Sequence, residues 1–468
     1  MLDRNLVGDV LAETLRFGGD YGEFFLEDRY STRLGLVGGK VETGISGREY
    51  GVGIRVFAGY NSVYAYTNQV TRENLLTVAR DAAQALNNQN SSDTVRFRHG
   101  EFENQHPIRI YPESKDQRYR VELMRTAYHE AKTYNELIEQ VRIRFMDEDQ
   151  KVLIANTDGD FVEDRRVRTR MAIEAIAAKG SEKQSGFYGP GAHMGLEFYD
   201  RIDISDYARE AARIAVTMIQ ADQCPSGRFP VIIDNEFGGV IFHEACGHGL
   251  EASSVAKKTS VFADKLGEQI ASPLVTAWDD GTIVNAWGSQ NVDDEGTPTQ
   301  RTLLIDKGIL RGYMVDKLNG RRMNMHSTGS GRRQSYKFAP TSRMSNTFID
   351  AGESTPEQII ANTEYGLYAR YMGGGSVNPA TGEFNFAVNE GYMVRNGKIA
   401  EPVRGATLIG RGAEVLKQID MVGNNLALGQ GMCGAASGSI PANVGQPMLR
   451  VSEMTVGGRK GKGDRHEA

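Results

Sequence analysis

The stretch Val240-Ile241-Phe242-His243-Glu244-Ala245-Cys246-Gly247-His248-Gly249-Leu250-Glu251 places two imidazoles and a carboxylate close together, behind an apolar lead-in. Imidazole nitrogens bind divalent transition metals, and a Glu beside such a metal can take a proton from a water that the metal activates. These side chains therefore indicate a metal-assisted hydrolase. The other interpretation is a pair of capping histidines at the end of a helix, because Gly249 is a typical helix stop.

The spacing of the two histidines departs from the familiar zinc-peptidase pattern, in which they stand four positions apart on a helix. His243 and His248 are five positions apart, which on a regular helix separates them by roughly 140°. That angle is too wide for one ion. A π-bulge inserts one residue and returns both side chains to one face, and Gly247 eases a local distortion. The sequence therefore predicts a widened or broken turn over residues 245–248.

The same stretch resembles the signature of the TldD/PmbA family, and specifically its TldD-type metallopeptidase branch. Other segments resemble this family as well: residues 293–298 (DDEGTP), 331–336 (GRRQSY), 405–410 (GATLIG), 421–424 (MVGN) and 431–434 (GMCG). The resemblance is dense from residue 228 to 458 and thinner at residues 51–56 (GVGIRV). It implies an N-terminal α+β domain and a C-terminal barrel-like β domain that carries the metal-binding helix.

Length and periodicity lead to the same fold class, α+β with two domains. A chain of 468 residues exceeds what one hydrophobic core usually holds. The break Cys224-Pro225-Ser226-Gly227 separates an N-terminal domain, residues 1–224, from a C-terminal β-rich metallopeptidase domain, residues 225–468. The second half reads mainly as antiparallel hairpins, of which Asn396-Gly397 is the strongest turn signal.

The spacing of apolar residues along the chain predicts where its helices and strands lie. The predicted helices are residues 7–15, 71–86, 115–134, 205–221, 354–362 (with a capping box at 354–357) and 413–419. The predicted strands include residues 52–56, 62–67, 141–145, 152–154, 171–175 and 230–233. Residues 87–93 are expected to form a polar segment that leaves the second helix. Residues 186–191 (GFYGPG) are expected to form a flexible loop, and residues 457–468 a frayed polar tail.

Composition excludes several classes of protein. There are 54 Lys and Arg against 60 Asp and Glu, a net charge of −6, which argues against a nucleic-acid platform. No stretch approaches the 18 or so apolar residues of a membrane span, and the opening Met1-Leu2-Asp3 does not resemble a secretion signal. Cys224, Cys246 and Cys433 do not form a paired disulfide framework. We expect a cytoplasmic location and neither a nucleic-acid nor a membrane partner.

The proposed cofactor is one divalent metal per chain, held by three protein ligands as catalytic metals usually are. His243 and His248 supply the nitrogens. The family resemblance places the third ligand at Cys433, which glycines frame on both sides. Cys246 is the alternative, although a buried free cysteine is commonly just a small hydrophobic residue. Zinc is the expected metal, and iron also fits two imidazoles and a thiolate.

Glu244 is the predicted catalytic residue, acting as the general base and then as the proton donor to the leaving amine. The alternative is a hydrogen-bond partner that only orients a ligand. Glu251 either orients His248 or is a solvated charge. No residue is assigned to the binding of an organic cofactor.

Other polar motifs receive an ordinary interpretation. We expect the acids Asp293, Asp294 and Glu295 to face solvent or cap a helix, in preference to a second cation site. Arg332 and Arg333 are expected at the surface. The alternative is that they and Tyr336 donate to a substrate carbonyl or oxyanion. The remaining histidines stand singly and without ligand spacing; they are His99, His106, His129, His193, His326 and His466.

The leading functional hypothesis is a metallopeptidase. The resemblance implies that its substrates are unfolded or extended peptides, taken into a cavity between two subunits. It also implies that the assembly is a dimer, either a homodimer or a heterodimer with a paralogous PmbA/TldE-type subunit. The main alternative is a non-catalytic partner subunit of such a heterodimer, from the branch that lacks the His-Glu-x-x-x-His set; here the set is intact. A metal-dependent amidase acting on a small molecule is a further possibility.

Overall fold

The computed structural model describes residues 2–86, 95–97, 102–378 and 381–458. Four features named above lie outside the described residues: the polar segment at residues 87–93, the tail from residue 459 on, His99 and His466. Among the described helices, none is both long and apolar enough to cross a membrane.

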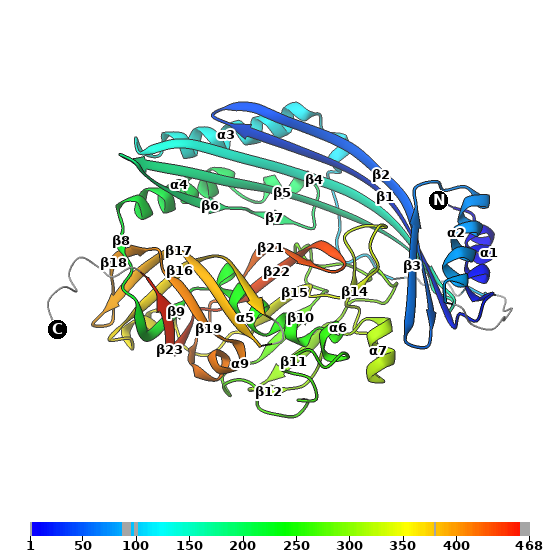
Figure 1. The fold of residues 1–468 in the computed structure, drawn as a ribbon. Helices are drawn as coiled ribbons and strands as arrows, with labels where there is room; N and C mark the ends of the chain where they lie inside the picture. Colours follow the sequence, from blue (N-terminus) through cyan, green and yellow to red (C-terminus); the bar gives the residue numbers. More distant parts are fainter. Residues whose placement is uncertain (1, 87–94, 98–101, 379–380, 459–468) are drawn as a thin grey trace.

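A long antiparallel sheet, ordered β3-β2-β1-β4-β5-β6 with β7 paired to β5, forms most of the N-terminal half. Its strands are β1 (Tyr21–Val37), β2 (Lys40–Ala58), β3 (Asn61–Thr67), β4 (Ile138–Asn156), β5 (Phe161–Lys179), β6 (Glu182–Tyr188) and β7 (Gly191–Ala192). The turn at Asp158-Gly159 joins β4 to β5, whose pairing runs from Ala155↔Phe161 to Ile138↔Ala177. The long strands arch over the C-terminal half of the molecule (Figure 1).

Helices cover the two ends of this sheet (Figure 1). They are α1 (Arg4–Leu15), α2 (Arg72–Gln84), η1 (Pro112–Ser114), α3 (Gln117–Thr133), η2 (Leu196–Asp200) and α4 (Ile204–Gln220). Val7, Leu11 and Leu75 place α1 and α2 against β1 and β2, whereas α3 and α4 pack on β4 and β5. The side chain of Thr71 caps α2, as the sequence predicts. The predicted α+β character is confirmed.

Two local predictions need correction. Residues 186–188 belong to strand β6 and not to a flexible loop. A Cβ atom on Gly186 would lie 2.0 Å from the carbonyl oxygen of Ala211, so this glycine lets α4 approach the sheet. In the short helix α8 (Pro356–Ala361), the capping box is formed by Thr355 and Gln358, one position later than the motif predicts.

The C-terminal half contains a closed barrel, because β16 pairs with β9 and also with β17 along the path β16-β9-β23-β19-β17. Strands β18, β8 and β20 extend it. These elements are β8 (Asp222–Gln223), β9 (Gly227–Ile233), β16 (Tyr365–Asn378), β17 (Glu383–Arg395), β18 (Lys398–Arg404), β19 (Thr407–Arg411), β20 (Ile419–Val422) and β23 (Leu449–Gly457). The Asn396-Gly397 turn joins β17 to β18 with Arg395 opposite Lys398, and both turn residues have positive φ, as this type of hairpin requires.

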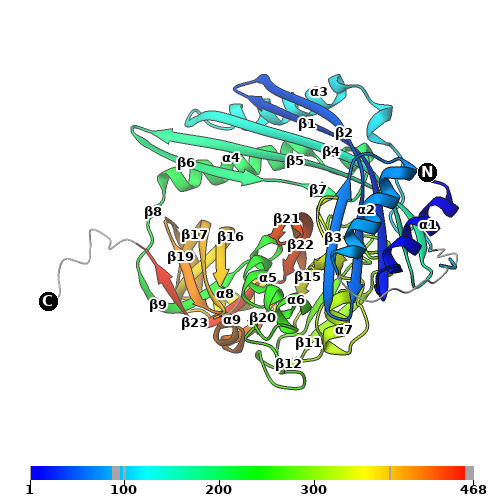
Figure 2. The same ribbon diagram turned by 45° about the vertical axis from the view of Figure 1, so that its right-hand side comes forward.

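A second sheet, ordered β12-β11-β10-β15-β22-β21, lies beside the barrel. Its strands are β10 (Ala277–Asp280), β11 (Arg301–Asp306), β12 (Ile309–Leu310), β15 (Asn346–Ile349), β21 (Ala427–Ala435) and β22 (Gly438–Gln446), and β13 (Gly331–Arg332) pairs separately with β14 (Thr341–Ser342). The helical segments are η3 (Glu236–Gly239), α5 (Val240–Ala245), η4 (Gly247–Leu250), α6 (Ala252–Val255), α7 (Lys317–Met323), α8, α9 (Gly412–Val415) and η5 (Leu416–Gln418). Helix α5 contacts β16 and β17 of the barrel and β15 and β22 of the second sheet (Figure 2).

The hydrophobic cores follow the two halves of the chain. The largest core contains residues from 224 to 456, whereas the cores under α1 to α4 contain residues before 220. A small cluster joins the halves through contacts such as Phe25 and Ile154 with Val292 and Tyr336. This distribution agrees with a domain boundary at residues 224/225, which stays a prediction.

Candidate metal centre

The chain breaks its helix between the two histidines. Helix α5 ends at Ala245, Cys246 leaves the helical region with φ −130° and ψ −48°, and the 3₁₀ turn η4 begins at Gly247. The broken turn predicted from the spacing is therefore present, without a π-bulge. A Cβ atom on Gly247 would lie 2.3 Å from the sulfur of Met344, so a larger residue at this turn would have to displace that side chain.

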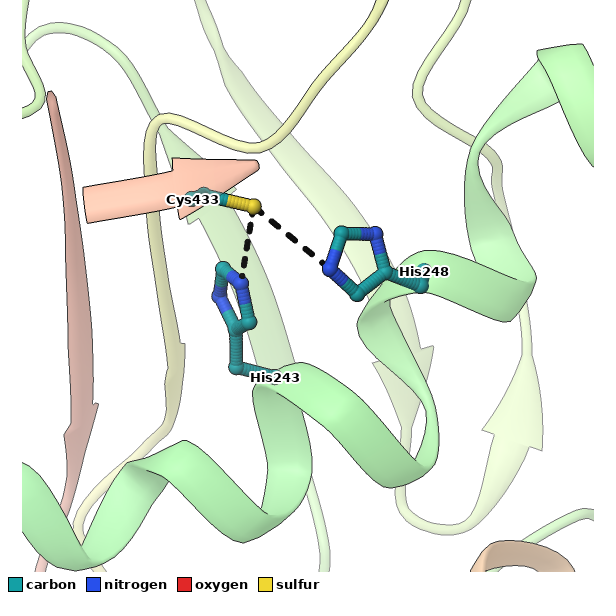
Figure 3. A group of neighbouring side chains, drawn as sticks. All are labelled: His243, His248 and Cys433. Carbon is teal, nitrogen blue, oxygen red and sulfur yellow. Dashed lines mark hydrogen bonds between the residues drawn. The ribbon is translucent and has the colours of Figure 1, made fainter. Parts of the chain in front are cut away.

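The break brings His243, His248 and Cys433 together. The Nε2 atom of His243 lies 3.2 Å from Cys433 Sγ, and the Nε2 atom of His248 lies 3.5 Å from it. Both ring nitrogens face the sulfur, which arrives from strand β21 (Figure 3), and the three donor atoms lie within 4.8 Å of one another. Tetrahedral zinc holds nitrogen and sulfur ligands about 3.5 Å apart, so these donors fit one divalent ion.

The electrostatics of the cluster favour a bound cation. Burial opposes ionisation of the Cys433 thiol, but His243 and His248 outweigh burial and lower its pKa to about 4. Burial also disfavours a charged His248, yet Glu251 and Cys433 raise the pKa of that imidazole to about 11. A thiolate and a carboxylate thus surround one imidazole, and either a proton or a metal ion can balance their charge.

The other cysteines lie outside this cluster, and all three are free, as the sequence predicts. Cys246 is fully buried in the core of the C-terminal half, and burial raises the pKa of its thiol. Burial likewise raises the pKa of Cys224 to about 11. Neither thiol joins the His243–His248–Cys433 group.

Glu244 lies at the accessible side of the cluster. Its Oε2 atom is 3.7 Å from His248 Nε2, the ring nitrogen that faces Cys433. The Glu244 side chain is 24% exposed and that of His248 is 13% exposed. A carboxylate in this position can exchange protons with a group bound between the donors.

The opposite side of His248 is held by Glu251, which is buried and not a solvated charge. Its Oε2 atom lies 3.3 Å from His248 Nδ1, the contact by which carboxylates commonly orient metal-binding histidines. Glu251 Oε1 lies 3.7 Å from Nε of Arg343.

Arg343 is a site residue that the sequence reasoning missed. Its guanidinium donates hydrogen bonds to the carbonyl oxygen of Cys433 and to Ser437 Oγ and the Gly438 carbonyl oxygen in the β21–β22 turn. This fully buried side chain therefore ties the strand carrying the sulfur to the carboxylate behind His248. Arg343 lies 90 residues from Cys433 in sequence, so no local pattern indicates the link.

We expect Glu251→Gln to weaken zinc binding about ten- to a hundredfold, the usual effect of losing the carboxylate behind a ligand imidazole. The dissociation constant is measured by competition with a chromophoric chelator. Glu414→Gln, an exposed change on α9, serves as the control. An unchanged constant in a folded Glu251→Gln protein would show that the carboxylate has no orienting role.

The acidic motif at residues 293–295 is buried, contrary to the expectation of solvent-facing acids. Asp294 pairs with Arg166, Glu295 pairs with Arg55, and Asp293 accepts hydrogen bonds from backbone amides, including that of Gly331. The pairs of Asp294 and Glu295 join the two halves of the molecule, and the oxygens that these contacts occupy are not presented to a cation.

The expectation of surface positions for Arg332 and Arg333 is also wrong, because both are buried, as is Tyr336. Arg333 pairs with Glu23 of strand β1. The backbone amide of Tyr336 donates to Glu27 of the same strand. The motif therefore holds the C-terminal half against the long sheet.

Two of the histidines interpreted as ordinary form a buried pair. The rings of His106 and His193 contact each other at an interplanar angle of 32°, with centroids 4.6 Å apart. Burial, with a contribution from Arg168, lowers the pKa of His106 to about 4. They are uncharged packing residues, and neither belongs to the metal cluster.

Two imidazoles, a thiolate and a neighbouring carboxylate, carried by a broken helix beside a β-barrel, form the arrangement expected of a metal-dependent hydrolase. Three family models match along the chain: PmbA/TldA metallopeptidase domain 1 at residues 22–86, the central domain at 110–219 and the C-terminal domain at 226–458. The chain belongs to the PmbA/TldD metallopeptidase family, which confirms the resemblance seen in its sequence.

Relatives and solved structures agree with this assignment. The chain is 36% identical over 451 residues to a metalloprotease TldD homolog of Haemophilus influenzae, covering 94% of this chain and 93% of that protein. The fold matches TldE from Thermococcus kodakarensis with a TM-score of 0.75 and 19% identity, over 94% of this chain and 97% of that one. It also matches a candidate modulator of a DNA gyrase from Thermotoga maritima with a TM-score of 0.77 and 21% identity, over 93% and 96%.

Proposed function

We propose that this chain hydrolyses peptide bonds in unfolded or extended polypeptides, using one divalent metal ion held by His243, His248 and Cys433. The observation that carries the proposal is the convergence of two Nε2 atoms and one Sγ atom with Glu244 at their accessible side. Zinc is the proposed ion, and iron fits the same donors.

Each side chain of the site has its own role in the proposed reaction. A bound divalent metal supplies Lewis acidity, which activates a water and polarises the scissile carbonyl. Glu244 takes the proton of that water and passes it to the leaving amine. Glu251 fixes the ring of His248, and Arg343 fixes the backbone of Cys433. The ligands His248 and Cys433 thus rest on buried supports, whereas Glu244 follows His243 on helix α5 and is partly exposed.

An extended substrate suits the position of strand β21. This strand is the last of its sheet and carries Cys433. Trp287 and Arg343 already donate to the carbonyl oxygens of Gly431 and Cys433, so a polypeptide would pair with the remaining backbone groups of this edge and pass close to the metal ligands. Pairing through the backbone selects for an unfolded chain and not for one side chain. We propose substrates of this kind, without a preferred sequence.

The alternative role, a non-catalytic partner subunit, shares this fold, because the TldE structure matches the chain over nearly its whole length. The fold therefore does not separate the two roles. The complete His243–His248–Cys433 cluster favours the catalytic one. We propose that the working assembly is a dimer, formed with a second copy or with a paralogous PmbA/TldE-type subunit, and that the free cysteines reflect a cytoplasmic location.

The purified chain is expected to hold about one metal ion and to cleave an unstructured peptide, measured by elemental analysis and mass spectrometry of the products. Removing the metal with a chelator abolishes cleavage, and adding zinc or ferrous iron back restores it and identifies the working ion. A stably folded protein serves as the resistant control substrate. A metal-free chain that is inert alone but activates a second protein would support the partner-subunit role instead.

A further inference from the structure

A cavity of about 240 Å³ lies between the long sheet and the hairpin that carries Cys433. Met432 and Pro441 form its wall on the hairpin side and are paired across strands β21 and β22. Successive side chains of a strand point to opposite faces, so Met432 points away from the face occupied by Cys433. The cavity is therefore separated from the metal centre by the β21–β22 ladder, which lies beneath the long strands (Figure 1).

Arginines dominate the wall of this cavity. They are Arg29, Arg33, Arg166, Arg168, Arg332 and Arg333. Three of them are paired with carboxylates: Arg29 with Glu49, Arg166 with Asp294, and Arg333 with Glu23. We call this cavity the arginine pocket. Among its described lining residues, the one acidic side chain is Glu148.

Arg332 lacks such a partner among the described carboxylates, and Arg168 has only a loose one, Glu148. Arg332 donates to the carbonyl oxygens of Met344 and Pro441 and forms no ion pair with a described carboxylate. Arg168 donates to two carbonyl oxygens, and its carboxylate neighbour Glu148 is 3.8 Å away, beyond hydrogen-bond distance. Arg332 and Arg168 therefore share the pocket with a single lining carboxylate, Glu148, which lies 3.8 Å from Arg168 and 4.0 Å from Arg29.

Both guanidinium groups are shielded from water, with side-chain exposure of 2% for Arg168 and residue exposure of 2% for Arg332. Burial, together with the nearby Arg168, lowers the pKa of Arg332 to about 9. Burial lowers the pKa of Arg168 to about 10. Burial is the largest cause of both pKa shifts, and both side chains nevertheless stay charged, as arginine does in proteins. The Nε atoms of Arg332 and Arg333 are also buried without a described acceptor.

We propose that the arginine pocket binds a small oxyanion. Carboxylate and phosphate oxygens match the fork of N–H groups on a guanidinium, and the cavity has room for such an ion with a few waters. Arg332 supplies the unpaired charge, Arg168 adds a charge that Glu148 offsets only loosely, and Arg33 lies exposed at the rim. The anion is either the terminal carboxylate of a peptide or a free phosphate. The site does not require the metal.

The test is calorimetric titration of the full-length protein at low ionic strength with inorganic phosphate and, separately, with acetyl-alanine and its amide. We expect saturable binding of an oxyanion, weakened about ten- to a hundredfold in Arg332→Gln. Arg33→Glu reverses a rim charge without disturbing the buried contacts, and it is expected to weaken binding as well. Arg411→Gln, an exposed change on β19, leaves binding unchanged.

The probes distinguish the source of the anion. Binding of acetyl-alanine but not of its amide indicates a peptide terminus, and binding of phosphate alone indicates a free anion. If circular dichroism shows that Arg332→Gln does not fold, the affinity of Arg33→Glu relative to wild type decides whether the pocket binds the anion. Absence of saturable binding, or equal affinities in wild type and both variants, overturns the proposal. Because the readout is binding, a failure of the peptidase assignment leaves this result unaffected.

Discussion

Glutamine in place of Glu244 is expected to leave the metal content unchanged and to lower kcat on an unstructured peptide about 10²–10⁴-fold. A carboxamide keeps the shape of the side chain but does not accept a proton at neutral pH. Glu244 lies 3.7 Å from the metal-facing nitrogen of His248 without being one of the clustered donors. The change therefore removes the base and spares the ligands. KM is expected to change little, because the base acts in the transition state.

The matched control is Glu251→Gln, the same chemical change on the other side of His248. That variant loses affinity for the metal, so its turnover recovers at saturating zinc. Turnover in Glu244→Gln does not recover, because its metal is already bound. Steady-state kinetics at increasing zinc separates the two. Wild-type turnover in a metal-loaded Glu244→Gln protein would remove Glu244 from the mechanism.

Local signals predict the elements that carry the site. The five-residue spacing of the histidines requires a break, and the chain breaks at Cys246. Thr71 caps its helix, and Asn396-Gly397 forms a hairpin turn, because a cap or a tight turn depends on a few neighbouring residues. The family resemblance points to Cys433. Spacing alone does not, because the sulfur comes from a distant strand.

The length of the long strands and the burial of their charged residues are harder to predict from the sequence. In β4, the polar run Asp147-Glu148-Asp149-Gln150 interrupts the apolar alternation, so the sequence predicts two separate strands. The strand is continuous because this run is buried and meets cations. Arg120 of α3 pairs with Asp147, and Arg165 of β5 pairs with Asp149.

Residues 293–295 and 332–333 are misread for the same reason. A run of charges is usually solvated, and only a partner far away in sequence makes its burial tolerable. Here the partners Glu23 and Arg55 lie in the first strands of the chain, 310 and 240 residues from Arg333 and Glu295. No window of sequence contains both members of such a pair. The same distance hides Arg343, which supports Cys433.

Alanine in place of Cys433 is expected to have the largest effect on metal binding, weakening it by more than about a hundredfold. Loss of a carboxylate that only orients a ligand already costs up to about a hundredfold, and this change removes a ligand. It also removes the thiolate that lies 3.2 Å from His243 and 3.5 Å from His248. Cleavage of the peptide is then lost at any practical zinc concentration. The cobalt-substituted protein also loses the absorption band of a thiolate ligand.

Cys246→Ala is the control for this change, because Cys246 lies between the two histidines in sequence and is also fully buried. Its thiol is not among the clustered donors, and burial keeps it protonated by raising its pKa. The control variant should keep its metal, its cobalt band and its turnover. The opposite result, with metal lost from Cys246→Ala and kept by Cys433→Ala, would show that Cys246 and not Cys433 is the third metal ligand. In that case the helix break would present Cys246, and not a strand edge, to the ion.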